Sequence, residues 1–106
     1  MGQQITVRIT REPEWGQIAP LLESVGLKAV VRMIDGLPAF PDEIPEPGWK
    51  ELRLSLDGGM VTLRREPEGI ACVVWGNAQG DLIRSWKACA WAIAKAGNSP
   101  DAFEEP

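Results

Sequence analysis

The sequence lacks histidine and tyrosine altogether and contains only two cysteines, Cys72 and Cys89. Without histidine, the chain has neither the commonest general base nor the commonest transition-metal ligand. Any serine or cysteine nucleophile would also lack its usual activating base. We therefore predict that the protein is not an enzyme and that it uses no cofactor and no metal ion.

The two cysteines are far apart in the sequence and do not have the spacing of metal ligands. The strand register inferred below turns Cys72 away from the helix that carries Cys89. We therefore expect two free thiols rather than a disulfide.

Long apolar runs are also missing. No run approaches the roughly 20 residues that span a bilayer, and the start of the chain lacks the charged and apolar regions of a signal peptide. We therefore expect no membrane span and a cytoplasmic location. The 11 basic and 15 acidic residues give a net charge of -4. This acidity argues against a general binder of nucleic acid or anionic membranes, because both are themselves negative.

The composition is that of an ordinary globular protein. Hydrophobic residues make up 44% and charged residues 25% of the 106 positions. A chain of this length can bury one hydrophobic core but is too short for two. We predict a single domain over residues 1–98. The acidic residues after position 98 predict a flexible tail over residues 99–106.

The segment from Lys50 to Lys95 predicts three antiparallel strands followed by one helix. Leucines alternate with polar residues over 52–56, which is typical of a strand with one face in water. Asp57-Gly58 then predicts a two-residue turn of type I′. The pairs that this turn would create are Leu54 with Val61, Leu52 with Leu63 and Glu51 with Arg64.

Glu66-Pro67-Glu68-Gly69 predicts a type I turn whose final glycine takes a positive φ. This turn would set Leu63 opposite Val73. The residues then expected to face the helix are Ala71, Val73 and Trp75, and those expected to face away are Ile70, Cys72 and Val74. Because a strand that is apolar on both faces usually lies inside a sheet, we expect a further strand beside this one.

A helix follows, with Asp81 as its expected N-cap and Gly97-Asn98 at its end. Its apolar side, expected to cover the sheet, consists of Leu82, Ile83, Trp86, Cys89, Ala90 and Ile93. Its other side carries Arg84, Lys87, Trp91 and Lys95. Trp91 stands near the centre of that polar side on a helical wheel.

Trp91 has three interpretations that the sequence leaves open. An exposed tryptophan framed by Arg84, Lys87 and Lys95 is the kind of anchor that protein interfaces use. Alternatively, the acidic tail folds back and places Phe103 on the indole. A homodimer through the same face is the third interpretation.

The earlier part of the chain predicts a strand over about Gln4–Thr10 and a helix that Gly26 ends. Leu27–Ile34 predicts a second strand, parallel to the first and a candidate neighbour of Ile70–Trp75. Prolines make Asp35–Trp49 a long connection. The expected fold is an α+β two-layer sandwich in the order β-α-β-β-β-α, with a five-stranded mixed sheet and both helices on one face.

The loop from Gly76 to Gly80 lies where backbone amides at a helix start can hold an anion. It lacks the lysine and glycine spacing of a phosphate loop, and Asp81 would repel phosphate. We predict a small non-catalytic protein that binds another protein or itself through Arg84, Lys87, Trp91 and Lys95. The alternative is a regulatory domain that binds a small ligand or anion through Gly76, Asn77 and Gly80.

Overall fold

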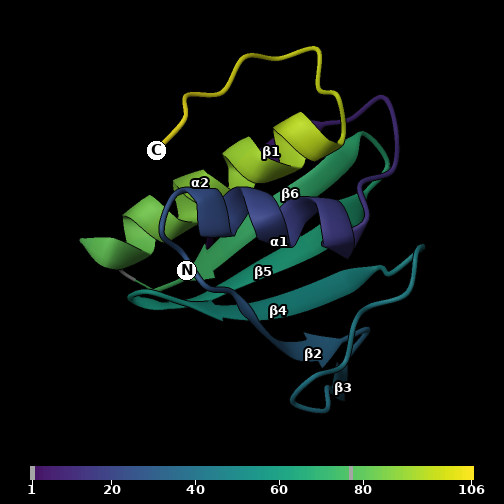
Figure 1. The fold of residues 1–106 in the computed structure, drawn as a ribbon. Helices are drawn as coiled ribbons and strands as arrows, with labels where there is room; N and C mark the ends of the chain where they lie inside the picture. Colours follow the sequence, from purple (N-terminus) through teal and green to yellow (C-terminus); the bar gives the residue numbers. More distant parts are fainter. Residues whose placement is uncertain (1, 77) are drawn as a thin grey trace.

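The computed structural model describes residues 2–76 and 78–106 (Figure 1). The described part of the chain forms one six-stranded antiparallel sheet with two helices on one of its faces, so the α+β class is confirmed. The strand order is β1-β6-β5-β4-β2-β3. The elements are β1 (Gly2–Arg8), α1 (Trp15–Ser24), β2 (Val30–Ile34), β3 (Leu37–Pro38), β4 (Glu51–Leu56), β5 (Gly59–Glu66), β6 (Gly69–Trp75) and α2 (Asp81–Ala96).

The sixth strand, β3, lies inside the segment expected to be a plain connection. It pairs with β2 through a two-residue turn at Asp35-Gly36, where φ is 50° and 84° respectively. Positive φ at both positions is the signature of a type I′ hairpin turn. Pro38 fits there because β3 is the last strand of the sheet and its missing N–H costs no ladder bond.

The pairing of β4 with β5 confirms the predicted register. Leu54 lies opposite Val61 and Leu52 opposite Leu63. The prediction of a type I′ turn between these strands was wrong, because of its two residues only Gly58 has a positive φ, of 88°. A single positive φ at the second turn position is a property of type II turns.

The faces predicted for β6 were wrong. The turn between β5 and β6 has two residues, so Cys72 rather than Val73 lies opposite Leu63. Because side chains alternate along a strand, this shift of one residue reverses every side chain of β6. Cys72 and its neighbours on the same face are buried under the helices, and Trp75 points away from them with 61% of its surface exposed.

The further strand expected beside β6 is present, but it is β1 rather than β2. β1 runs antiparallel to β6, with Ile5 opposite Cys72. β2 pairs antiparallel with β4 at the other end of the sheet, so the mixed sheet with a parallel crossover was wrong. Three strands lie between β1 and β2, and the chain crosses them by way of α1 (Figure 1).

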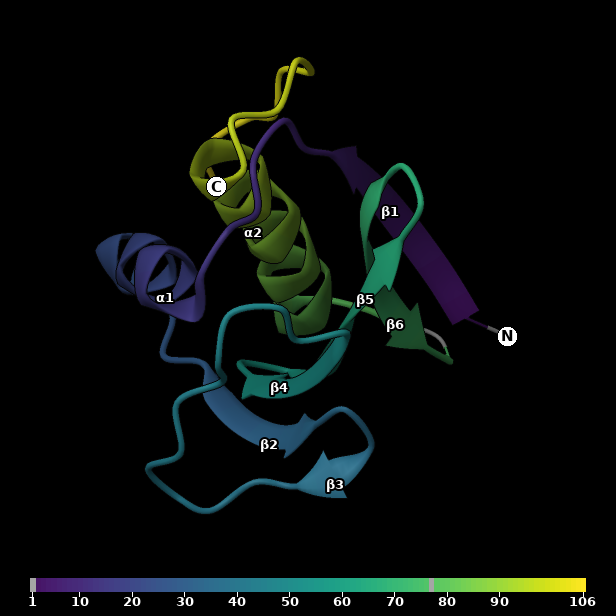
Figure 2. The same ribbon diagram turned by 90° about the vertical axis from the view of Figure 1, so that its right-hand side faces the viewer.

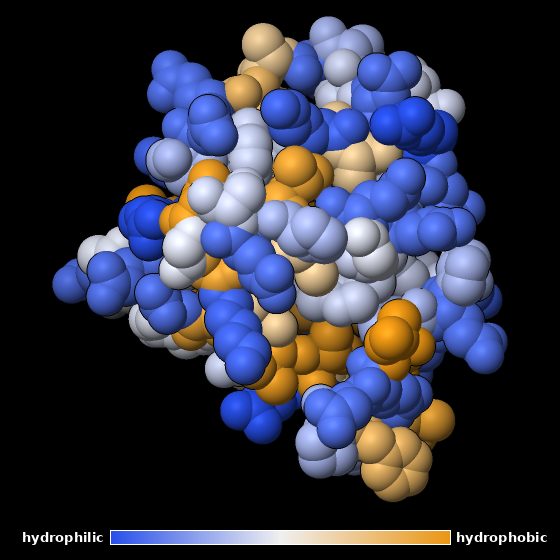
Figure 3. Space-filling view, viewed as in Figure 1, coloured by the Kyte–Doolittle hydropathy of each residue, from blue (hydrophilic) through white to orange (hydrophobic). Residues whose placement is uncertain are grey.

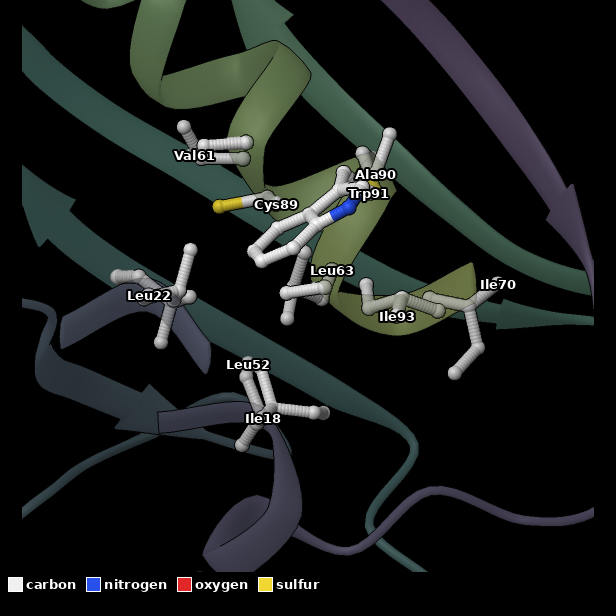
Figure 4. Close-up of a cluster of buried hydrophobic side chains, with 14 of the residues drawn as sticks. Ile18, Leu22, Leu52, Val61, Leu63, Ile70, Cys89, Ala90, Trp91 and Ile93 are labelled. Carbon is white, nitrogen blue, oxygen red and sulfur yellow. The ribbon is translucent and has the colours of Figure 1, made fainter. Parts of the chain in front are cut away.

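The core lies between the sheet and α2, with α1 packed alongside α2 (Figure 2). Figure 4 shows part of this cluster, in which α1 contributes Ile18 and Leu22, the sheet contributes Leu52, Val61, Leu63 and Ile70, and α2 contributes Cys89, Ala90, Trp91 and Ile93. Trp86 is also buried, and its indole N–H donates to the Cys72 carbonyl at 2.8 Å. This bond ties α2 to β6.

Candidate functional site

The side of α2 that was predicted to bind a partner exposes its three basic residues but not its tryptophan. Arg84, Lys87 and Lys95 are exposed, as expected. Trp91 has only 5% of its surface exposed and belongs to the core cluster, so the expectation of an exposed tryptophan was wrong. Its ring centroid lies 5.7 Å from the Lys95 ammonium nitrogen.

The C-terminal tail covers this side of α2. After the helix ends, the tail turns back and runs along it (Figure 1). The Ser99 amide donates to the Ala94 carbonyl at 2.8 Å, and Arg8 Nε donates to the Asp101 carboxylate at 2.9 Å. This guanidinium lowers the pKa of Asp101. Phe103 is half-buried against the core, and it lines a hollow of about 270 Å³ together with Trp91.

Removing residues 100–106 should therefore uncover Trp91. We expect the tail-deleted protein to show stronger acrylamide quenching of tryptophan fluorescence than the full chain. The same deletion in a Trp91→Phe background is the matched control and should change the quenching little. If deletion has the same small effect in both backgrounds, the tail does not cover this indole.

The residues predicted to bind an anion are only partly brought together. Gly80 lines a hollow of about 360 Å³ together with Arg84 and Lys87, while exposed Gly76 is not part of its lining. Asn77 lies outside the described residues. The tail closes this hollow with Glu104, Glu105 and Pro106. Two carboxylates at its wall would oppose an anion, because like charges repel.

The thiols are unsuited to nucleophilic chemistry. Cys72 and Cys89 are both free and fully buried, and Cys72 faces α2, contrary to the register from which free thiols were inferred. Burial raises the pKa of Cys89 to about 12, and it raises the pKa of Cys72 as well. A thiol in this state carries almost no thiolate at neutral pH, and the thiolate is the reactive form.

An acidic hollow lies at the β2 and β3 end of the sheet. It has a volume of about 370 Å³ and is lined by Ile34, Asp35, Glu43, Ile44, Glu46, Pro47, Gly48 and Trp49. The Asp35 carboxylate accepts hydrogen bonds from the amides of Lys50 at 2.7 Å and Glu51 at 2.9 Å, and these bonds lower its pKa. The Arg65 guanidinium carbon lies 5.5 Å from the Trp49 ring centroid. Asp35 is thus used structurally, to hold the end of the connection.

Exposed apolar side chains also occur at this end. Leu37, Phe40 and Ile44 each have at least 70% of their surface exposed. Apolar surface is visible toward the β2 and β3 end of the molecule in Figure 3. These residues belong to β3 and to the proline-rich connection after it, among several carboxylates.

The opposite end of the sheet has a different character. β1 is the outermost strand, and among the described residues its one strand partner is β6 (Figure 2). Its side chains are exposed apart from half-buried Ile5 and buried Val7. The outer edge of β1 therefore offers unpaired backbone N–H and C=O groups along its length.

An exposed tryptophan stands beside this edge. Trp75 lies opposite Gly2 on the sheet face away from the helices. A Cβ atom on Gly2 would lie 2.9 Å from Trp75 Cε3, so the indole rests on the Gly2 backbone. If the register of β5 with β6 continues, it sets Met60, which is 40% exposed, on the other side of Trp75. Trp75 thus forms an apolar platform one strand inward from the edge.

The sequence reasoning missed this platform because its β6 register turned Trp75 toward the core. The turn residues did not indicate this error, because Pro67 cannot take the positive φ that the favoured two-residue hairpin turns require. The structure nevertheless has a two-residue turn here, and that turn sends Trp75 outward.

The fold and this edge define a class: a two-layer α+β protein with one long, unprotected edge strand. Comparisons with protein-family models, with curated proteins and with solved structures find no match to the chain. Within residues 2–76 and 78–106, no helix is long and apolar enough to cross a bilayer. The same part of the chain contains no cluster of three or more metal-ligating side chains.

Proposed function

We propose that this chain is a cytoplasmic, non-catalytic protein-binding module, with residues 1–98 as its single domain. It binds a partner by adding an extended strand to the outer edge of β1. The observation that carries this proposal is the seven-residue length of that open edge beside exposed Trp75. We place the proposed binding site on β1 rather than on the side of α2 that carries Arg84 and Lys95, because the tail covers Trp91.

The two edges of the sheet differ in how they are protected. Proteins usually block an edge strand by keeping it short, or by placing proline or lysine on it. β3 has two residues, one of which is Pro38. β1 has neither proline nor lysine, and Gln3, Gln4 and Thr6 give it exposed but uncharged side chains. Of the two edges, β1 is the one that can accept a full strand.

Strand addition divides the work between backbone and side chains. Main-chain hydrogen bonds supply affinity, and side-chain contacts beside the edge supply specificity. Trp75 suits the second role, because tryptophan is enriched among the residues that dominate binding energies. Its position over Gly2 places it within reach of a side chain on the added strand, since neighbouring strands lie about 4.8 Å apart.

A capped peptide with the sequence of residues 2–8 tests whether the edge accepts a strand. We expect saturable binding, with slower amide exchange along β1 and a change in tryptophan fluorescence that Trp75→Phe abolishes. The matched control is the same peptide N-methylated at alternate positions. It keeps the side chains but loses the row of N–H donors that would face β1. Equal binding of both peptides, or binding of neither at millimolar concentration, would contradict strand addition.

A further inference from the structure

We infer that the strand added to β1 is β1 of a second copy of this chain, antiparallel and centred on Ile5, so that two six-stranded sheets join into one. The inference rests on the proposed function and names its partner. A two-fold axis through the edge brings the same surface of both copies together, so the surface must be complementary to itself. β1 meets that requirement in its charge, its pattern and its neighbours.

The alternation of β1 restricts the register. Odd-numbered residues such as Ile5 face the helices, and even-numbered residues such as Thr6 face away, as their pairing with β6 shows. Two copies keep both faces aligned only if the paired residue numbers have an even sum. A sum of 10 is the choice that pairs the whole of β1. The pairs are then Gly2 with Arg8, Gln3 with Val7, Gln4 with Thr6, and Ile5 with Ile5.

Charge and polarity agree with this register. Arg8 is the one charged residue of β1, and it meets Gly2 rather than another cation. Gln4 meets Thr6, and within one copy the Gln4 amide already donates to the Thr6 hydroxyl at 3.1 Å. Side chains of these types can therefore hydrogen-bond across the new seam as well. No pair in this register opposes like charges.

Arg8 gains a specific contact on the outer face. It is largely exposed, with 59% of its side chain in solvent, and its ion pair with Asp101 is at the surface. In the joined sheet it stands beside the partner's Gly2, which has no side chain to block it. The partner's Trp75 lies over that glycine, so the guanidinium can stack on the indole. The two-fold axis creates this contact twice.

The helix side of the seam combines apolar and charged groups. Half-buried Ile5 lines a hollow of about 260 Å³ with Lys87, Ala90, Ala102, Phe103 and Glu104. In the dimer the two Ile5 side chains meet at the axis, and each closes the other's hollow. Apolar surface is thereby removed from water on this face, while the Arg8 and Trp75 contacts form on the other.

Opposite charges at the axis test the register. Wild-type protein should change from 11.6 kDa to twice that mass as its concentration rises in sedimentation equilibrium. Ile5→Lys and Ile5→Glu should each weaken association at least tenfold, because each sets like charges face to face. An equimolar mixture of the two variants should recover association. Leu37→Lys, at the opposite edge of the sheet, is the matched control and should associate like wild type.

Gln4→Lys combined with Thr6→Lys covers the case in which the Ile5 variants fail to fold. Both positions are exposed, and the double variant sets two like-charged pairs across the seam. Loss of association in this folded variant would support the register. If the Ile5 variants and the double variant all associate as strongly as wild type, the register is wrong. A wild-type chain that stays at 11.6 kDa but binds the peptide of residues 2–8 would contradict the self-pairing alone. A chain that neither associates nor binds the peptide would contradict the proposed function as well.

Discussion

Replacing Gly69 with alanine should destabilise the protein by about 3 kcal/mol, in the range of severe overpacking. β1 crosses Gly69 so closely that a Cβ atom there would lie 1.9 Å from the Val7 carbonyl oxygen. Val7 belongs to the strand that pairs with β6, so the clash cannot be relieved without moving β1. The variant should therefore also lose the proposed binding edge. Urea unfolding at low protein concentration measures the change without a contribution from association.

Gly16→Ala is the control for this substitution. Gly16 lies in α1, and no heavy atom would lie within 4 Å of an added Cβ. Alanine there should be neutral or should stabilise the helix by up to about 1 kcal/mol. A cost below about 0.5 kcal/mol for Gly69→Ala would show that β1 is not fixed against β6 in this register.

Replacing Trp86 and Trp75 with alanine should destabilise the protein to very different extents. Trp86→Ala removes a buried indole and its bond to the Cys72 carbonyl, and we expect a loss of about 4 kcal/mol. Trp75→Ala removes a side chain that is 61% exposed, and we expect a loss below about 1 kcal/mol in the unassociated protein. Equal losses would contradict the inward and outward assignment of these side chains.

Trp86→Phe separates packing from hydrogen bonding in this prediction. Phenylalanine keeps most of the buried ring but leaves the Cys72 carbonyl without its donor. An unpaired buried carbonyl costs about 1–3 kcal/mol, so this variant should fall between wild type and Trp86→Ala. Chemical unfolding followed by circular dichroism reports all three values.

The hairpin of β4 and β5 could be predicted because its leucines alternate with polar residues. That alternation permits one face to be buried, and the turn at Asp57-Gly58 then leaves one register. β6 has no such signal, because it is apolar on both faces. Its register depended on the length of one turn, and an error of one residue there reversed Trp75 and Cys72.

The fate of Trp91 depended on contacts between distant parts of the sequence. A helical wheel correctly placed it beside Arg84, Lys87 and Lys95, but a wheel cannot show that the tail returns over that face. β1 was predicted as a strand to within two residues at each end. Its place at the edge of the sheet could not be predicted, because that depends on which strand pairs with β6 after the chain has crossed the whole sheet.

Amide hydrogen exchange along β1 tests the central claim most directly. In dilute protein, those of its amides that point outward should exchange rapidly, while the amides paired with β6 stay protected. At concentrations where the mass doubles, the outward amides of residues 2–8 should become protected too, and those of Leu37 in β3 should not change. Association that leaves the exchange of β1 unaltered would contradict strand addition at this edge.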